Sequence, residues 1–232
     1  MPEKTINHFM FLKLRDPFWT LDPGKRKEIF NSLAKDLQSE AACSNFYQVS
    51  PMNAEVDLMI WSAVPLANEK DEANFFEHLA RVMPAQRAFL QPVVNLWGYT
   101  RPSVYSRAPS PQEIEPFAAE RQTYLVLYPF VKTINWYLLN KDTRQGMMNE
   151  HIRIGHQYPE IKQLLLYCFG VQDQEFIVVY ETENLYRFSE LVNELRSSDV
   201  RVYTERDTPV HTGIWRAPDM LAELFGAKGE YR

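Results

Sequence analysis

One stretch of the sequence, YPFVKTINWYLLNKDTRQGMMNEHIRIGH, concentrates side chains that could do chemistry. It begins at Tyr128, carries a lysine and a tryptophan, and ends at His156. If its second part is a helix, His151 shares one stripe with Met147 and Met148, and polar residues lie opposite. The imidazole therefore points into apolar surroundings. Two interpretations are open: a histidine packed in the core, or a histidine that binds a ligand in an apolar pocket.

The second histidine of this helix, His156, is not expected to share a metal with the first. Five residues of helix correspond to a rotation of about 500°, so the two side chains diverge by roughly 140°. The sequence contains no GxSxG, HExxH, P-loop or GxGxxG motif. Cys43 and Cys168 have no metal-binding spacing. His151 is therefore left as a single candidate ligand.

The composition is that of an ordinary globular protein, with 232 residues, 45% of them hydrophobic and 24% charged. A net charge of −5 without a basic run argues against nucleic acid as a partner. No stretch reads as a membrane helix or a signal peptide, and the isolated cysteines fit a reducing compartment. We therefore predict a cytoplasmic protein with no membrane partner. The 14 Phe, 12 Tyr and 5 Trp suit a flat apolar ligand or a generous core equally well.

The elements that must position this stretch occur in the same order in both halves of the chain. The first half predicts strands at residues 8–14, 46–50, 56–64 and 93–99, an extended stretch at 103–105, and helices at 25–37 and 72–82. The second half predicts strands at 124–130, 163–169, 175–180, 200–203 and 210–215, and helices at 142–155 and 184–195. Each half reads β-α-β-β-α-β, the ferredoxin-like or split βαβ order. The expected fold class is α+β, with two such units side by side in one subunit and helices outside antiparallel sheets.

A segment rich in proline and polar residues, RAPSPQEIEP at residues 107–116, separates the two halves. It has no hydrophobic periodicity and therefore predicts a linker. We expect an N-terminal unit over residues 1–106, a linker over 107–121 and a C-terminal unit over 122–232. The C-terminal unit then carries His151.

In combination, four motifs of the second half resemble the chlorite dismutase-like haem proteins, which include the chlorite dismutases and the coproheme decarboxylases of bacterial haem synthesis. The motifs are Tyr128–Pro129 with Lys132, Asn135–Trp136–Tyr137, MMNEHIRIG with His151, and LRSSD, which ends at Asp199. The resemblance is close over residues 124–215. Before residue 124, the chain resembles the family only in its pattern of elements. The family's subunit is a pair of ferredoxin-like domains and is usually assembled into a ring, commonly a homopentamer. The resemblance therefore implies a homo-oligomer.

The resemblance also implies a role for the residues around the histidine. His151 corresponds to the proximal ligand of the haem iron, and Trp136 to a tryptophan packed near it. Asp199 stands where the family has a carboxylate, usually of glutamate, that supports the ligand. On composition alone, Asp199 also fits an ordinary solvated loop residue.

Four further residues correspond to groups around the porphyrin carboxylates. Tyr128 and Lys132 match a tyrosine beside a reacting propionate and a cation that positions carboxylates. Arg196 matches an arginine near the propionates, and Arg201 is a second candidate. Without the resemblance, Tyr128 also reads as an ordinary strand aromatic before a proline.

The distal side departs from the dismutase pattern. True chlorite dismutases have an arginine, and one branch of the decarboxylases a glutamine, where this sequence has Leu164. Gln163 lies beside it and faces the opposite way if the segment is a strand. Leucine cannot hold a departing hypochlorite or donate a hydrogen bond to peroxide. Chlorite dismutation is therefore not expected, whereas some decarboxylases lack a polar group at this position.

The resulting hypothesis is a haem-binding oxidoreductase that converts iron-coproporphyrin III (coproheme) to haem b with hydrogen peroxide. The bound group is then coproheme or haem b, and a radical on Tyr128 attacks a propionate held by Lys132 and Arg196. The alternatives are a weak haem peroxidase, a haem carrier or sensor without turnover, or a relative that has lost haem. The apolar Leu164 favours the carrier or sensor.

Overall fold

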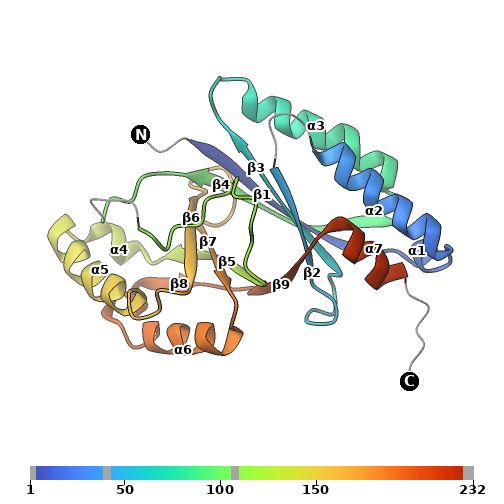
Figure 1. Ribbon diagram of the computed structural model, residues 1–232. Helices are drawn as coiled ribbons and strands as arrows, with labels where there is room; N and C mark the ends of the chain where they lie inside the picture. The colour runs from blue at the N-terminus through green and yellow to red at the C-terminus, as the bar shows by residue number, and fades with distance from the viewer. Residues whose placement is uncertain (1–3, 39–42, 106–109, 227–232) are drawn as a thin grey trace. The chain divides into compact units, whose positions relative to one another are not determined.

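The computed structural model describes residues 4–38, 43–105 and 110–226. The chain divides into two compact units, Glu3–Trp97 with Gly213–Arg232, and Gly98–Thr212 (Figure 1). Both are built of an antiparallel sheet with helices. The predicted α+β fold class is therefore confirmed.

The first unit has the ferredoxin-like order of elements. It contains β1 (Thr5–Leu14), α1 (Asp16–Trp19), α2 (Pro23–Leu37), β2 (Cys43–Gln48), β3 (Leu58–Pro65), α3 (Asp71–Gln86) and β4 (Leu90–Thr100). Its strand order is β4-β1-β3-β2, and α2 and α3 lie side by side (Figure 1). Helix α2 begins at Pro23, where the side chain of Asp22 caps it by accepting a hydrogen bond from the backbone N–H of Lys25 at 3.1 Å.

The second unit repeats this order and contains the predicted site. Its elements are β5 (Tyr124–Lys132), α4 (Ile134–Leu138), α5 (Lys141–Gly155), β6 (Lys162–Tyr167), β7 (Phe176–Thr182), α6 (Leu185–Leu195), the 3-10 helix η1 (Asp199–Tyr203), β8 (Thr204–Arg206) and the start of β9 (His211–Arg216). Strand β7 pairs antiparallel with both β5 and β6, and the order is β9-β5-β7-β6. The side chain of Asn184 caps α6 by accepting from the backbone N–H groups of Tyr186 and Arg187.

Residues 200–203 do not form the predicted strand but belong to η1. The alternation of apolar residues suggested a strand, but the backbone N–H of Arg201 donates to the carbonyl of Ser198 at 2.9 Å and closes a turn. Residues 103–105 are not in a strand either. The short helices α1 and α4 were not predicted, since neither is long enough to show a helical period.

The boundary between the units differs from the predicted one. Tyr47 of β2 pairs with Trp215 of β9, and α7 (Pro218–Gly226) packs on α2. The end of the chain therefore belongs to the first unit, and the units meet in sequence within β4, between Trp97 and Gly98. The prediction failed here because it divided the chain once, whereas the last strand pairs with an element far away in the sequence.

The described part of the predicted linker is held against the second unit. Residues 106–109 lie outside the described residues. After them, Gln112 and Ile114 are buried, and Ile114 donates its backbone N–H to the carbonyl of Gln163 at 3.0 Å. The segment therefore covers the edge of β6 through backbone hydrogen bonds. Such contacts require no apolar period, which is why the sequence resembled a free linker.

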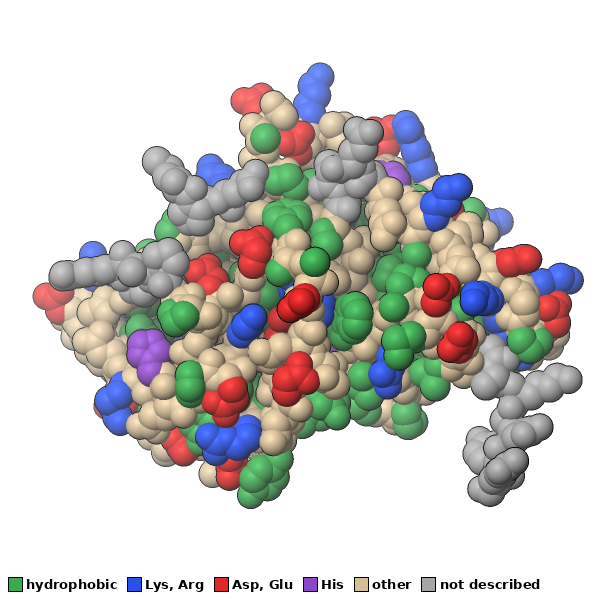
Figure 2. Space-filling view, viewed as in Figure 1, with side chains coloured by type: hydrophobic (Ala, Val, Ile, Leu, Met, Phe, Trp, Pro, Cys, Tyr) green, Lys and Arg blue, Asp and Glu red, His purple; other side chains and the backbone are tan. Residues whose placement is uncertain are grey.

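The surface and the helices give two further observations. Within the described ranges, no helix combines the length and the apolar character needed to cross a membrane. On the face drawn in Figure 2, acidic and basic side chains are interspersed with hydrophobic ones. Charge on that face is therefore mixed and not gathered by sign.

Candidate functional site

One face of the second unit's sheet packs against α5 and α6 through a buried apolar cluster. Its members are Val126, Ile154, Tyr158, Ile161, Val178, Tyr180, Phe188 and Leu191. Tyr128 packs against this cluster. Tyr128 pairs with Val178, and Val178 pairs with Leu165. Because cross-strand partners share a face, Tyr128, Val178 and Leu165 form one row on the side of the sheet that the helices cover.

The hydroxyl of Tyr128 is held in its protonated form. Burial raises its pKa above the usual value, and a hydrogen bond with Tyr180 and the charge of Arg196 oppose that effect. The rings of Tyr128 and Tyr180 have their centroids 6.2 Å apart. At neutral pH, Tyr128 is therefore a mostly buried phenol that can give up a hydrogen atom.

Lys132, at the end of β5, lies among aromatic rings. Its Nζ is 4.8 Å from the ring centroid of Trp136 and 5.8 Å from that of Phe130, and it donates to Oγ1 of Thr204 at 3.2 Å. Burial, followed by the charge of Arg201, lowers the pKa of Lys132 to about 8. The side chain is therefore still cationic at neutral pH, and the rings stabilise it in place.

Glu175 fixes the junction of β5 and α4 and was not predicted. Its Oε2 accepts hydrogen bonds from the backbone N–H of Lys132 at 2.7 Å and from the hydroxyl of Tyr137 at 2.5 Å. The carboxylate thus ties the start of β7 to the segment that carries Lys132 and Trp136. A single glutamate before a strand gives no signal in the sequence, because its partners are brought to it by folding.

His151 lies on α5, one turn before the buried Ile154, with half-buried Met147 and Met148 on the preceding turn. Burial, followed by the charge of Lys132, lowers the pKa of His151 to about 4. Its Nδ1 is buried without a hydrogen-bond partner among the described residues. At neutral pH the ring is therefore uncharged and has a lone pair for a metal, the state that ligation requires.

His151 does not belong to a cluster of metal-binding side chains in the described part of the chain. Within the described ranges, no group of three or more His, Cys, Asp or Glu side chains could hold a metal ion. His156 is exposed at the end of α5. A metal site built from several protein side chains is therefore not found in the described ranges, which suits a porphyrin, because a porphyrin supplies most of the metal's ligands itself.

The two residues predicted to support His151 have different surroundings. Trp136 is buried, with its ring centroid 5.8 Å from that of Tyr203. Asp199 is exposed, and its backbone N–H donates to Oε2 of Glu150 at 3.3 Å. Since Nδ1 of His151 has no partner in the described part of the chain, the predicted support from Asp199 is not formed in this structure.

Arg196 and Arg201 converge on a carboxylate that was not predicted. Oδ2 of Asp207 contacts Nη1 of Arg196 at 2.5 Å and Nη1 of Arg201 at 2.8 Å. The charges of all three residues act on the pKa of Tyr128, and those of Arg201 and Asp207 act on the pKa of Lys132. The predicted cations therefore gather near the predicted tyrosine.

The predicted distal residue, Leu164, faces the side of the sheet opposite to Tyr128. It pairs with Val179, and Val179 pairs with Leu127, in the row opposite to that of Tyr128. Leu164 is only 4% exposed, whereas Leu165, in the row of Tyr128, is 38% exposed. Counting residues from His151 cannot determine how β6 pairs with its neighbour. A shift of the pairing by one residue moves every side chain of the strand to the opposite face of the sheet. Gln163 lies on the side of Tyr128, opposite to Leu164 as predicted, and is exposed.

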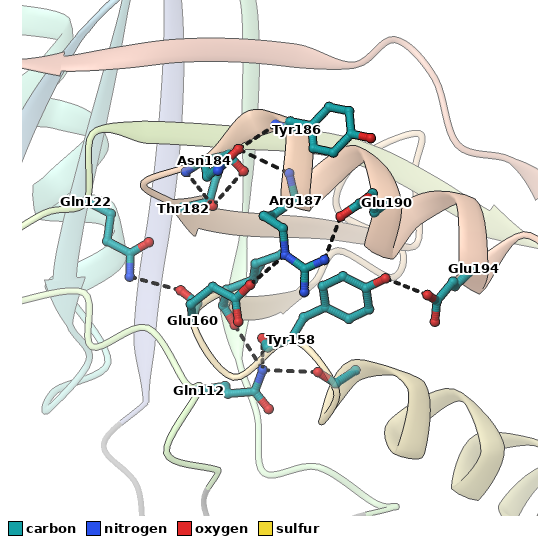
Figure 3. A network of polar contacts seen from close by, with 12 residues as sticks. Gln112, Gln122, Tyr158, Glu160, Thr182, Asn184, Tyr186, Arg187, Glu190 and Glu194 are labelled. Carbon is teal, nitrogen blue, oxygen red and sulfur yellow. Dashed lines mark hydrogen bonds and ion pairs between the residues drawn. The ribbon is translucent and has the colours of Figure 1, made fainter.

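The end of α5 is fastened by a buried amide from the predicted linker. Nε2 of Gln112 donates to the carbonyls of Gly155, Tyr158 and Ile161 at 3.3, 2.9 and 3.0 Å (Figure 3). These carbonyls lie at and just beyond the last turn of α5, and those of Gly155 and Tyr158 also accept backbone hydrogen bonds from Tyr158 and Ile161. The contact therefore fixes the helix one turn after His151.

A second set of contacts joins α5 to α6. The hydroxyl of Tyr158 donates to Oε1 of Glu194 at 2.6 Å, and the guanidinium of Arg187 lies 4.6 Å from the ring centroid of Tyr158. Arg187 also bonds to Glu160 and Glu190 (Figure 3). The segment that directly follows α5 is thereby held to α6, whose C-terminal cap is Arg196.

These observations define a class of protein: two ferredoxin-like units, with a neutral histidine, a buried phenol and three cations in the second unit. The sequence model described as "Chlorite dismutase" matches residues 23–216. The chain therefore belongs to the chlorite dismutase family.

Two relatives and one solved structure illustrate the similarity. The chain is 26% identical over 217 residues to a coproheme decarboxylase of Mycolicibacterium smegmatis, a match that covers 90% of each protein. It is 27% identical over 194 residues to a coproheme decarboxylase of Staphylococcus saprophyticus, with 78% of this chain and 76% of the relative covered. It superimposes with a TM-score of 0.81 on the chlorite dismutase of Candidatus Nitrospira defluvii in complex with imidazole, at 19% identity over 98% of this chain and 97% of that one. At that identity the structural match supports the fold.

Proposed function

We propose that the second unit binds an iron porphyrin and catalyses the hydrogen peroxide-dependent oxidative decarboxylation of iron-coproporphyrin III to haem b. The observation that carries the proposal is the gathering of Arg196 and Arg201 near the protonated Tyr128, with Lys132 near His151. The two relatives named as coproheme decarboxylases match this chain over most of its length. Chlorite dismutase activity has weaker support, because the β6 residue in the row of Tyr128 is Leu165 and not a cation.

The described residues fit an iron porphyrin. The neutral ring of His151 suits an iron ion, and the half-buried Met147 and Met148 suit the apolar face of the macrocycle. Lys132 and the two arginines suit its carboxylates, through charge-assisted hydrogen bonds. When bound, the iron would supply reactivity towards peroxide and the oxidising power that the described side chains lack.

Each residue then has a defined task. His151 would bind the iron and thereby fix the position of the porphyrin in the site. Lys132 and Arg196 would hold propionates so that one β-carbon lies in contact with the hydroxyl of Tyr128. Tyr128 gives up its phenolic hydrogen atom, and the resulting radical takes a hydrogen atom from that carbon. Loss of CO₂ and a second electron leaves a vinyl group, so each propionate consumes one peroxide and releases two waters.

A single-turnover assay tests the proposal. The protein is mixed with ferric coproporphyrin III, titrated with hydrogen peroxide, and the porphyrins are resolved by chromatography with mass detection. We expect stepwise loss of CO₂ from two propionates in the native protein and none in Tyr128→Phe. Tyr186→Phe, which changes an exposed tyrosine on α6, is the matched control and should react like the native protein. Turnover by Tyr128→Phe at the native rate would contradict the role of this tyrosine.

A haem carrier or sensor without turnover is the second candidate, and Leu165 favours it. The side chain of Leu165 offers no hydrogen bond to peroxide, and Gln163, the polar residue of β6 on the same side, is exposed. In the same assay, this function predicts a Soret band that is lost in His151→Ala, with every propionate intact after peroxide. Release of oxygen from chlorite would instead identify a dismutase.

A further inference from the structure

Asp207 lies at the centre of the cations in the second unit. The residue follows β8, and its Oδ2 contacts Arg196, the C-terminal cap of α6, and Arg201 of η1. One carboxylate oxygen therefore joins two cations that come from different elements. Without it, two guanidinium groups of like charge would lie close together and repel each other.

The burial of the three side chains differs in a way that assigns their roles. The side chain of Asp207 is 15% exposed, whereas those of Arg196 and Arg201 are 42% and 35% exposed. The carboxylate is thus the enclosed member of the cluster and the arginines are its outer members. A ligand that arrives from solvent would meet the guanidinium groups first.

The arginines can bind a second carboxylate while they keep Asp207. Each guanidinium carries five N–H donors in a rigid planar fork. The contacts described between these arginines and Asp207 use only Nη1 of each. Pairing with Asp207 therefore orients both guanidinium groups. It also leaves further N–H donors of each arginine for a ligand.

We propose that Asp207 is a positioning residue that clamps Arg196 and Arg201 together so that both present N–H groups to the same porphyrin carboxylate. The proposal rests on the proposed function, since it assumes that the second unit binds a carboxylate-bearing porphyrin. The competing idea is that Asp207, which has the charge of a propionate, occupies the place of the ligand and weakens its binding. The two ideas predict opposite signs when the carboxylate is removed.

The test is a Soret titration of the full chain with ferric coproporphyrin III. We expect Asp207→Asn and Asp207→Ala to lower the affinity about tenfold, the scale of one charge-assisted hydrogen bond that is no longer aligned. Asp207→Glu should recover part of the loss. Formate should restore binding by Asp207→Ala in a concentration-dependent manner, because it can replace the missing carboxylate, and should not strengthen binding by the native protein.

Glu205→Gln is the matched control. It removes one negative charge two residues away from Asp207, at an exposed position of β8, and should bind like the native protein. Equal weakening in this variant would mean that net charge, and not the clamp, determines the affinity. That result would overturn the proposal.

Three other outcomes have defined meanings. Unchanged or tighter binding by Asp207→Asn would show that Asp207 competes with the ligand, and would overturn the clamp. Weaker binding that neither Asp207→Glu nor formate restores would assign Asp207 a purely structural role, and would also overturn it. Failure of the native protein to bind the porphyrin would overturn the proposed function itself, and it is observed before any variant is used.

Discussion

Burial drives three ionisable residues of the second unit towards their uncharged forms. It lowers the pKa of His151 and Lys132 and raises the pKa of Tyr128. The resulting charge states at neutral pH differ, because the ordinary pKa values of the three side chains differ. His151 and Tyr128 are neutral at pH 7, as the proposed roles of iron ligand and hydrogen-atom donor require. Lys132, with a pKa of about 8, keeps its charge but is close to losing it.

Lys132 should make porphyrin binding depend on pH. Its pKa is lowered from 10.5 to about 8, and only the protonated amine attracts a carboxylate. We therefore expect the affinity for ferric coproporphyrin III to be full below pH 8 and to fall as the pH rises through that value. Soret titrations at a series of pH values measure the effect.

Lys132→Gln should bind more weakly and lose this pH dependence. Lys162→Gln, which changes an exposed lysine on β6, should keep it. If the profiles of native protein and Lys132→Gln fall together above pH 8, another group is responsible.

At the scale of elements, the alternation of β6 places one leucine in the core and its neighbour on the side of Tyr128. Leu164 lies in the buried row with Val179, and Leu165 lies in the row of Tyr128. Under the proposed function, we therefore expect the two adjacent leucines of this strand to have different tasks. The pair offers a matched experiment, because the chemical change is the same at both positions.

We expect Leu164→Ala to lower the free energy of unfolding by about 2–5 kcal/mol, as is usual for a buried leucine, and to leave the Soret band of the bound porphyrin unchanged. Leu165→Ala should do the reverse, with a small change in stability and a shifted Soret band or altered affinity. Denaturant unfolding and porphyrin titration measure the two effects. A spectral change in Leu164→Ala alone would mean that the porphyrin lies on the other face of the sheet.

At the scale of the whole molecule, the end of the chain completes the first unit. The ring of Phe225 in α7 stacks on that of Phe30 in α2 with centroids 5.8 Å apart, and Nη1 of Arg26 donates to the carbonyl of Phe225 at 2.8 Å. The sequence thus leaves the first unit, forms the second, and returns. Stability of the first unit therefore depends on residues that follow the candidate site.

Phe225→Ala should lower the free energy of unfolding of the first unit by about 3–5 kcal/mol, the usual cost for a buried phenylalanine. Hydrogen exchange should accelerate in β1 and β3 more than in β5 and β7. Leu224→Ala, at the exposed neighbouring position, is the control and should change little. Equal acceleration in both units would mean that they unfold together.

The sequence by itself determined the features that depend on local patterns. Hydrophobic periodicity predicted the longer helices and most strands of both units, and hence the ferredoxin-like order. The resemblance to the chlorite dismutase family, carried by motifs around Tyr128 and His151, is confirmed by the match over residues 23–216. These signals are readable because the residues that cause them are neighbours in the chain.

Only the tertiary structure decided which residues meet. It placed Leu165 and not Leu164 in the row of Tyr128, because strand pairing and not chain counting determines register. It brought Asp207 between Arg196 and Arg201, and Glu175 onto the backbone of Lys132. It also returned the last strand to the first unit. Each of these contacts joins residues separated in sequence, and their energies depend on a three-dimensional arrangement that no local pattern records.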